Sequence, residues 1–587
     1  MRGLPADPEV PDEQRKRRRW IEGTWGAVIF VVLVITGIIL GGSLLLTSAS
    51  NRRKGRLGLS PQEDELLKAR CPYAAKIAPG LGFKNSSSFL GEKYKKHSVK
   101  VWGDMIRIPT QSYDKMGPLD EDPRWQVFYE FEQYLNETFP TFTGRSELVH
   151  VNTHGLVYVL EGADSSKKPL LLSGHQDVVP VPVNTASRWT YAPFSGFYDG
   201  QYMWGRGSAD CKNTVSAIFE ALESLCLQNF VPDRTIVVAL GFDEEESGYK
   251  GAGTISKYLE SRFGKNSFFM LLDEGGAIAE DVYGVDLALP DTGEKGRVNV
   301  VVDLQTTGGH SSVPPPHTSV GIMSELIATL ENTPFLPELE PSSPFYTQLQ
   351  CMARFGNESM PKSLRADIVN LEKDAKAKDR VLELQARDLY TKYLFSTSQA
   401  ADIIDGGSKS NALPEQVTAQ INYRIDVGSS VDDVEQKVEG LVRQIAHKYG
   451  LGVDGFGAYQ QGFDPVPKGK FTLSVTDALE PAPITDIVDN PSWTLLAGTI
   501  RHVFEDSGSV LASAHREIVV SPSLMTANTD TRHYWHLTPN IYRFNPVRMN
   551  YFMNIHAIDE RVRVDAHLET VAFYYDFVQN ADFFGDQ

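Results

Sequence analysis

Cysteine and positive charge are both scarce in this chain of 587 residues. Four cysteines without any CxxC spacing are too few for a disulfide scaffold, and Cys211 and Cys226 read as small buried residues. The other two are Cys71 and Cys351. Lys and Arg number 57 against 75 Asp and Glu, a formal net charge of −18. Nucleic-acid binding requires a basic face, so we expect no nucleic-acid partner.

The composition is otherwise that of a globular protein, with 41% hydrophobic and 10% aromatic residues. The chain is too long for one ordinary core, so we expect two domains, or one domain with a large insertion.

One long stretch lacks charge altogether. No charged residue occurs between Thr24 and Thr47, and an uncharged segment of this length matches the hydrocarbon thickness that a helix must cross. We therefore expect a transmembrane signal anchor at 24–47. Six Lys and Arg residues precede it and four follow closely, which favours a cytoplasmic tail at 1–23 and a lumenal remainder, a type II topology. A cleaved signal peptide is the alternative, because the small residues 48–50 follow the span.

Residues 48–95 are punctuated by Gly, Pro and Ser, as a stalk or an N-terminal wrap would be. Three sequons, at Asn85, Asn136 and Asn357, are compatible with N-glycosylation on the lumenal side. A chain of this size could hold as many by chance.

Four segments between Pro169 and Glu274 bring metal-type ligands to the end of an apolar run or the start of a helix. The runs at 170–172, 235–242 and 268–272 read as buried strands, and apolar residues recur every three or four positions from 215 to 226, as on one face of a helix. In an open α/β sheet, ligands lie outside the carboxyl ends of the strands, so these residues converge on one crevice. In chain order they are His175, Asp177, Asp210, Asp243, Glu244, Glu245, Glu246, Asp273 and Glu274.

Several carboxylates brought this close repel one another and raise their own pKa values unless divalent cations neutralise them. One His with several carboxylates and no Cys ligand suits a zinc-type site with open positions for water and substrate. Asp177, two residues after His175 in an extended segment, is placed to accept the second imidazole N–H. Two simpler explanations remain. The His-x-Asp sequence can be a chance tripeptide, and the acids at 243–246 can be the solvent-exposed first turn of a helix.

After Asp273 the pattern becomes strand, helix, strand, helix. Residues 297–305 and 417–427 alternate like half-exposed strands, 320–330 and 431–447 are helix candidates, and 335–350 read as a Pro-rich loop. This predicts a separate α+β lid domain at 296–465. Ligand-type residues reappear after it, so we interpret the lid as an insertion between catalytic parts at 96–295 and 466–587. His533, His536 and His556 compete for the last ligand position.

Together these blocks resemble the dizinc exopeptidase family that includes carboxypeptidase S and aminoacylase-1, most closely its membrane-anchored, vacuolar branch. The resemblance covers residues 100–580. It implies a three-layer α/β/α zinc-exopeptidase catalytic domain, an inserted ferredoxin-like lid or dimerisation domain, two zinc ions per subunit and a vacuolar location. The implied ligands are His175, Asp210 as the bridge, Glu245, Asp273 with Glu274 as its alternative, and His556.

The same resemblance assigns further roles. Glu244 is the implied general base, and Asp177 the carboxylate that supports the ligand His. In the lid, His310 would support the oxyanion, often across a homodimer, while Asn411 and Arg424 would hold substrate, the Arg through the free carboxylate. The segment 335–405 makes the lid larger than in shorter relatives.

The implied activity is that of a zinc-dependent metallocarboxypeptidase, which hydrolyses the C-terminal bond of short peptides, Gly-X dipeptides in particular, through a dizinc-activated water. One alternative is an N-acyl amino acid amidohydrolase or synthase built on the same residues. Another is a catalytically idle ectodomain that binds ligands. The idle ectodomain predicts lost ligands or a lost base, and every matched position is kept.

Overall fold

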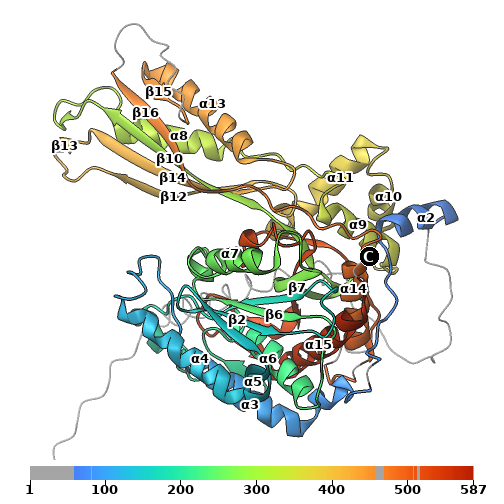
Figure 1. The fold of residues 1–587 in the computed structure, drawn as a ribbon. Coiled ribbons are helices and arrows are strands. Elements are labelled where there is room, and N and C mark those ends of the chain that lie inside the picture. Colours follow the sequence, from blue (N-terminus) through green and yellow to red (C-terminus); the bar gives the residue numbers. More distant parts are fainter. Residues whose placement is uncertain (1–58, 81, 457–467, 507, 512–515, 586–587) are drawn as a thin grey trace, which may run out of the picture.

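The computed structural model describes residues 59–80, 82–456, 468–506, 508–511 and 516–585. Within them the chain forms two main β-sheets, each with its own helices (Figure 1). The smaller sheet uses only strands between residues 296 and 479, whereas the larger one takes strands from before and after this stretch. The second unit is therefore inserted into the first.

The expected membrane anchor at 24–47 lies outside the described residues. None of the helices that the structure describes is both long and apolar enough to cross a bilayer.

In the described chain, ten strands build the larger sheet, eight of them in the order β1-β2-β6-β3-β7-β19-β9-β18. β8 pairs with β7, and β17 with β8. Because β6, β3, β7 and β19 run parallel, their carboxyl ends share one edge. The strands are β1 Glu147–Val151, β2 Gly155–Leu160, β3 Leu170–His175, β6 Ile236–Gly241, β7 Met270–Val282, β8 Val285–Ala288, β9 Asp291–Glu294, β17 Ile518–Val520, β18 Ser523–Met525 and β19 Ile541–Arg548.

Alternate residues of β3 face opposite helix layers. Leu170 and Leu172 join a core with most of the helices, whereas Leu171 packs with the helix on the other face, α7 Ala252–Phe263 (Figure 1). This confirms the three-layer α/β/α prediction. The helices of the first layer are α3 Glu92–Ile106, α4 Val127–Thr138, α5 Pro140–Arg145, α6 Lys212–Cys226, α14 Pro491–Asp506 and α15 Val564–Phe583.

The lid sheet has the order β12-β14-β10-β16-β15, in which β12, β14, β10 and β16 pair antiparallel and β15 pairs parallel with β16. Its two helices share one hydrophobic core with the sheet. This is the expected ferredoxin-like arrangement, and it extends away from the catalytic unit (Figure 1). The elements are β10 Gly296–Thr306, α8 Ser319–Glu331, β12 Ser398–Gly406, β14 Gln416–Ile425, α13 Val431–Tyr449, β15 Gly452–Asp454 and β16 Gly469–Leu479.

Most of the segment that was expected to enlarge the lid packs elsewhere. Residues 344–392 form four helices whose core includes Leu67 before the catalytic domain and Leu287 and Leu524 of the larger sheet. The Pro-rich stretch is partly helical, because Pro344 stands in the first turn, where its missing N–H costs nothing. The helices are α9 Pro344–Phe355, α10 Lys362–Val369, α11 Ala375–Gln385 and α12 Leu389–Lys392.

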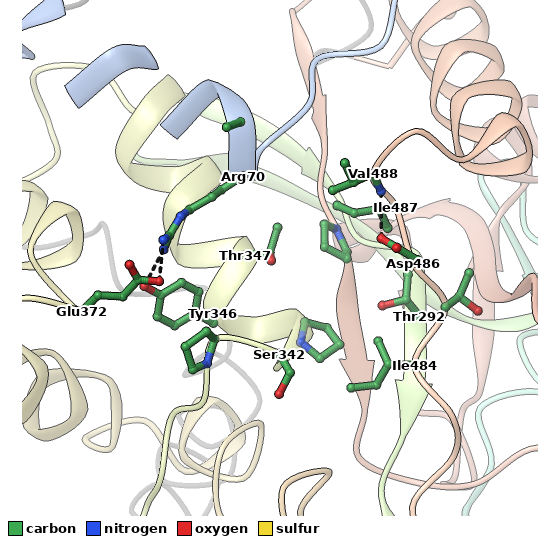
Figure 2. A pocket seen from close by; sticks show the side chains of 15 residues that line it. Arg70, Thr292, Ser342, Tyr346, Thr347, Glu372, Ile484, Asp486, Ile487 and Val488 are labelled. Atoms are coloured by element: carbon green, nitrogen blue, oxygen red, sulfur yellow. Dashed lines mark hydrogen bonds and ion pairs between the residues drawn. The ribbon is translucent and has the colours of Figure 1, made fainter. Parts of the chain in front are cut away.

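A disulfide between Cys71 and Cys351 joins this helical segment to the N-terminal helix α2 Pro61–Arg70. No role was assigned to this pair from the sequence, and one disulfide is consistent with the prediction that the cysteines are too few for a disulfide scaffold. Next to it, Arg70 donates to the Tyr346 hydroxyl at 2.7 Å and forms an ion pair with Glu372 (Figure 2). A cavity of about 560 Å³ opens beside this seam, and none of the expected metal ligands lines it.

A small four-stranded sheet supports the loop that carries His556. Its strands pair in the order β20-β21-β5-β4, and the loop runs from β20 to β21. The strands are β4 Phe197–Tyr198, β5 Tyr202–Trp204, β20 Phe552–Met553 and β21 Arg561–Arg563. Distant parts of the chain thus meet beside the larger sheet.

Candidate metal centre and active site

Asp210 lies between two histidines from distant parts of the chain. Its Oδ1 is 3.0 Å from Nε2 of His175, and its Oδ2 is 3.0 Å from Nε2 of His556. Each carboxylate oxygen thus faces a different imidazole, as a carboxylate that bridges two cations must do. The position agrees with the bridging role that the resemblance implies.

Two ligand sets share Asp210. In one, His175 Nε2 also lies 3.2 Å from Oε1 of Glu274; in the other, His556 Nε2 lies 3.1 Å from Oε1 of Glu245. The His175 side chain is 1% exposed and the His556 side chain 48%. One of the two histidines is therefore buried, and the other is half-exposed to solvent.

The carboxylate beside His175 belongs to Glu274, the alternative, and not to Asp273. Both follow the part of β7 that pairs with β3, and consecutive strand residues point to opposite faces. Asp273 is 1% exposed, and its Oδ2 has no hydrogen-bond partner among the described residues. This geometry favours Glu274, the alternative, over Asp273 for the fourth ligand position, which stays a prediction.

Asp177 organises the site from behind. Its carboxylate accepts hydrogen bonds from the Ser112 hydroxyl at 2.7 Å and from the backbone N–H groups of Glu244 and Glu245 at 3.1 and 3.2 Å. His175 Nδ1 lies 2.9 Å from the Asp177 carbonyl oxygen and 3.3 Å from its carboxylate. Since a carbonyl only accepts, Nδ1 carries a proton, and the neutral ring then presents the Nε2 lone pair to a metal.

Glu560 fixes the loop that carries Asp210. It accepts the backbone N–H groups of Ala209 at 2.8 Å and Asp210 at 3.3 Å and forms a buried ion pair with Arg206. Because Glu560 follows His556 by four residues, it couples the loops that carry these two ligands.

Nearby positive charge would stabilise the ionised form of the acids at this site. Burial raises the pKa of Glu274 to about 8 and raises the pKa values of Glu244 and Glu245, with neighbouring carboxylates adding to each shift. Hydrogen bonds with Asp210 and Glu245 raise the pKa of His556 to about 10. Two divalent cations would replace the protons that these groups otherwise retain. The donor set, imidazole nitrogens and carboxylate oxygens around one shared carboxylate, fits zinc.

The other acids after β6 point elsewhere. Asp243 accepts the backbone N–H groups of Lys250 and Gly251 at 2.8 and 2.7 Å, and Glu246 lies 3.4 Å from the Lys250 ammonium. Glu244 remains at the cluster, with an 11% exposed side chain. It is the acid expected to act as general base.

The competing histidines lie outside the ligand sets. His533 Nε2 is 2.8 Å from the Ser247 carbonyl oxygen, and His536 Nε2 is 3.2 Å from Glu260. Only His556 faces Asp210 among the three. Cys211 is buried and free, with its sulfur 3.2 Å from the His175 N–H, and burial raises the pKa of its thiol. The prediction that Cys211 and Cys226 are buried is confirmed.

The lid residues divide into two groups. Arg424 on β14 reaches the catalytic unit and donates from Nη1 to Oδ1 of Asn528 at 2.9 Å. His310 and Asn411 are exposed and lie side by side, where Ser311 N–H donates to the Asn411 carbonyl at 3.2 Å. They adjoin the pair β11 Gly309–His310 and β13 Ala412–Leu413 near the far end of the lid (Figure 1). Within one chain the structure therefore does not bring them to the metal cluster.

Arg532 is the residue of the site that received no role from the sequence. Its Nη2 lies 3.9 Å from Oε1 of Glu244. The sequence could have drawn attention to Arg532 only through the run Asn528-Thr-Asp-Thr-Arg532, which is rich in ligand-type residues. This run does not show which way any of its side chains points.

The three-layer fold and the shared ligand sets are those of a dinuclear metal-dependent peptidase. The sequence matches the model of peptidase family M20/M25/M40 over residues 171–580, and the chain belongs to this family. The expected family is thereby confirmed.

Relatives that align with this chain over most of their length support the same family assignment. Carboxypeptidase S of Saccharomyces cerevisiae is 37% identical over 559 residues, which cover 93% of this chain and 95% of the relative. The N-fatty-acyl-amino acid synthase/hydrolase of Bos taurus is 30% identical, with 92% and 95% covered. The crystal structure of an M20 family metallo-carboxypeptidase from Sulfolobus solfataricus shares the fold with a TM-score of 0.54 at 15% identity, covering 83% of this chain and 99% of that one.

Proposed function

We propose that this protein is a zinc-dependent metallocarboxypeptidase that removes the C-terminal residue of short peptides, Gly-X dipeptides in particular. The observation that carries the proposal is the placement of the two Asp210 oxygens, each 3.0 Å from a different histidine. The proposed ligands of two zinc ions are His175, Asp210, Glu245, Glu274 and His556.

Zinc ions bound there would lower the pKa of water and polarise the scissile carbonyl. Glu244 would take one proton from the attacking water and deliver it to the departing nitrogen. The water oxygen would first bond to the carbonyl carbon, and the bond between that carbon and the nitrogen would break once the nitrogen has received the proton, so one Glu244 would serve as base and then as acid. Its burial, which raises its pKa, suits the second role.

Arg424 is proposed to bind the free carboxylate of the substrate. It is partly buried near other arginines and has no carboxylate within ion-pair distance among the described residues, which leaves it available for an anion. Recognition of the free C-terminal carboxylate, which an arginine can bind through two parallel hydrogen bonds, is what a carboxypeptidase needs and an endopeptidase does not.

His310 and Asn411 are proposed to act in the site of a second copy. The lid offers a surface for a homodimer, because β12 is an edge strand on which Ile403 and Ile404 are 55% and 53% exposed. In that dimer His310 would support the oxyanion from across the interface.

The alternative substrate class is an N-acyl amino acid, which the same residues could hydrolyse or form. The observation that favours it is the 30% identical relative named as an N-fatty-acyl-amino acid synthase/hydrolase. A catalytically idle binding ectodomain is disfavoured, because both ligand sets and Glu244 are intact.

We also propose a type II membrane protein with its catalytic domain in the vacuolar lumen. The disulfide Cys71–Cys351 supports an oxidising compartment. Of the three sequons, Asn85 and Asn357 are exposed, whereas Asn136 lies within α4 and accepts from the Tyr158 hydroxyl at 3.2 Å. Glycosylation is therefore expected at the first two.

Metal analysis of the purified protein, paired with hydrolysis assays before and after chelation, tests the proposed function. We expect two zinc ions per chain, cleavage of Gly-Leu, loss of cleavage on chelation and its return with zinc. N-acyl amino acids in the same panel decide between the substrate classes. A zinc-loaded protein that cleaves neither class would contradict the enzymatic assignment.

A further inference from the structure

The loop from β18 to β19 is held rigidly beneath the active site. Glu294, fully buried, accepts from the Thr529 N–H at 2.9 Å and forms an ion pair with Nε of the buried Arg543 at 2.9 Å. Asn528 donates to the Lys295 carbonyl at 2.6 Å. Since Glu294 and Lys295 stand where the catalytic sheet passes into the lid, the loop has a fixed position relative to both units.

Arg532 leaves this loop toward Glu244 with unused donors. Its side chain is 5% exposed, and Nε donates to the Thr529 carbonyl at 3.0 Å. Nη1 is buried and has no hydrogen-bond partner among the described residues, while Nη2 is 3.9 Å from Oε1 of Glu244. A buried guanidinium N–H without a partner is costly, so an acceptor from outside the chain is expected there.

A second arginine adjoins this one. Arg424 is bonded to Asn528, which lies four residues before Arg532. Burial, with the neighbouring charges of Arg297 and Arg532, lowers the pKa of Arg424. Arg297 and Arg424 stand directly opposite on β10 and β14, a pairing that repels unless anions intervene. Asp477 forms an ion pair with Arg297, whereas Arg424 has no ion-pair partner among the described residues and Arg532 reaches only Glu244, at 3.9 Å.

We propose that Arg532 is the second arginine of the substrate-carboxylate site, and that with Arg424 it binds the free α-carboxylate of the C-terminal residue. This inference rests on the proposed function and deepens it. In such a substrate the carboxylate carbon is two bonds from the nitrogen that must receive the proton. A carboxylate held by Arg532 therefore places the leaving nitrogen beside Glu244, the proton donor.

The test compares ligands that differ only in the carboxylate. Zinc-loaded protein is assayed with Gly-Leu and Gly-Leu amide, and titrated calorimetrically with leucine and leucinamide. We expect Arg532→Ala to lower kcat/KM for Gly-Leu and the affinity for leucine by about ten- to a hundredfold, as for a lost charged hydrogen bond. The values for the two amides should not change.

Arg262→Ala is the matched control, because it also removes one positive charge, from an arginine that pairs with Glu147 and Glu161. It should leave all four values unchanged. An equal fall for Gly-Leu and its amide would mean that Arg532 acts only through Glu244, and would overturn the proposal. So would unchanged leucine binding.

Two further results keep the test decisive. If the Arg532→Ala variant loses zinc, the test uses the Arg532→Lys variant instead. Lysine keeps the positive charge beside Glu244 but lacks the planar guanidinium group that binds a carboxylate through two hydrogen bonds. Weakened leucine binding by that variant supports the proposal, and wild-type binding overturns it. If the wild type binds leucine through Arg532 but cleaves no peptide, the carboxylate site stands and the proposed peptidase function fails.

Discussion

The strongest test of the metal centre is a pair of neighbouring substitutions, Glu274→Gln and Asp273→Asn. Each removes one negative charge from a buried carboxylate with almost no change in volume. The residues are adjacent on β7, yet only Glu274 lies 3.2 Å from Nε2 of His175. The pair therefore separates a ligand from a buried acid in the same strand.

The expected magnitudes differ. Substituting groups that merely support ligands costs about 10- to 100-fold in metal affinity, so losing the Glu274 carboxylate should cost at least about 100-fold. That corresponds to about 2.8 kcal/mol of binding free energy. Asp273 is not the carboxylate that lies beside His175, so its amide should bind zinc within about tenfold of the wild type.

The assay is zinc content per chain after dialysis against a series of zinc buffers. We expect Glu274→Gln to lose the more buried zinc ion and Asp273→Asn to retain two. Thermal unfolding of both variants with saturating zinc checks that the fold survives. Loss of zinc by Asp273→Asn alone would refute the assignment, and equal losses by both would show that charge in the region matters more than coordination.

Three other predictions follow from the same structure. Glu244→Gln should keep both zinc ions and lower kcat by about 10²- to 10⁴-fold, measured by turnover of Gly-Leu alongside metal analysis; wild-type turnover would remove Glu244 from its role. Chelated protein should lose thermal stability as pH rises from 6 to 9. The pKa values of Glu274, about 8, and His556, about 10, are raised in the folded state, so the folded state binds more protons than the unfolded state. Bound zinc should suppress this loss, and a chelated protein that gains stability over that pH range would contradict the predicted sign. Cys71→Ser with Cys351→Ser should lower the free energy of unfolding by about 2–5 kcal/mol in a denaturant titration without lowering zinc content, since the disulfide lies away from the ligand sets.

The main features of the catalytic domain could be predicted because they are local. The apolar run at 170–172 became β3 and that at 235–242 became β6, and each delivered its ligands at the carboxyl end. The alternating strands of the lid could be predicted equally well, since β10 buries every second residue along most of its length. These patterns follow from the period of two that any half-buried strand imposes on its sequence.

Other features depended on contacts between distant residues. Composition offered no sign that Cys71 would meet Cys351, 280 residues away, or that residues 344–392 would pack with α2 and the catalytic sheet instead of the lid. The sequence of an amphipathic helix shows that the helix has an apolar face, but it does not show which surface of the protein covers that face.

The sequence by itself determined the chemical inventory: acids and imidazoles after buried strands, a chain that leaves the catalytic domain and returns, and an uncharged stretch near the N-terminus. Only the tertiary structure placed Glu274, and not Asp273, beside His175, His556 beside Asp210, and Arg532 near Glu244. The physical reason is that ligation and proton transfer depend on side-chain direction to within an ångström. That direction is fixed by the packing of strands and loops far apart in the chain, and not by the residues next to the ligand.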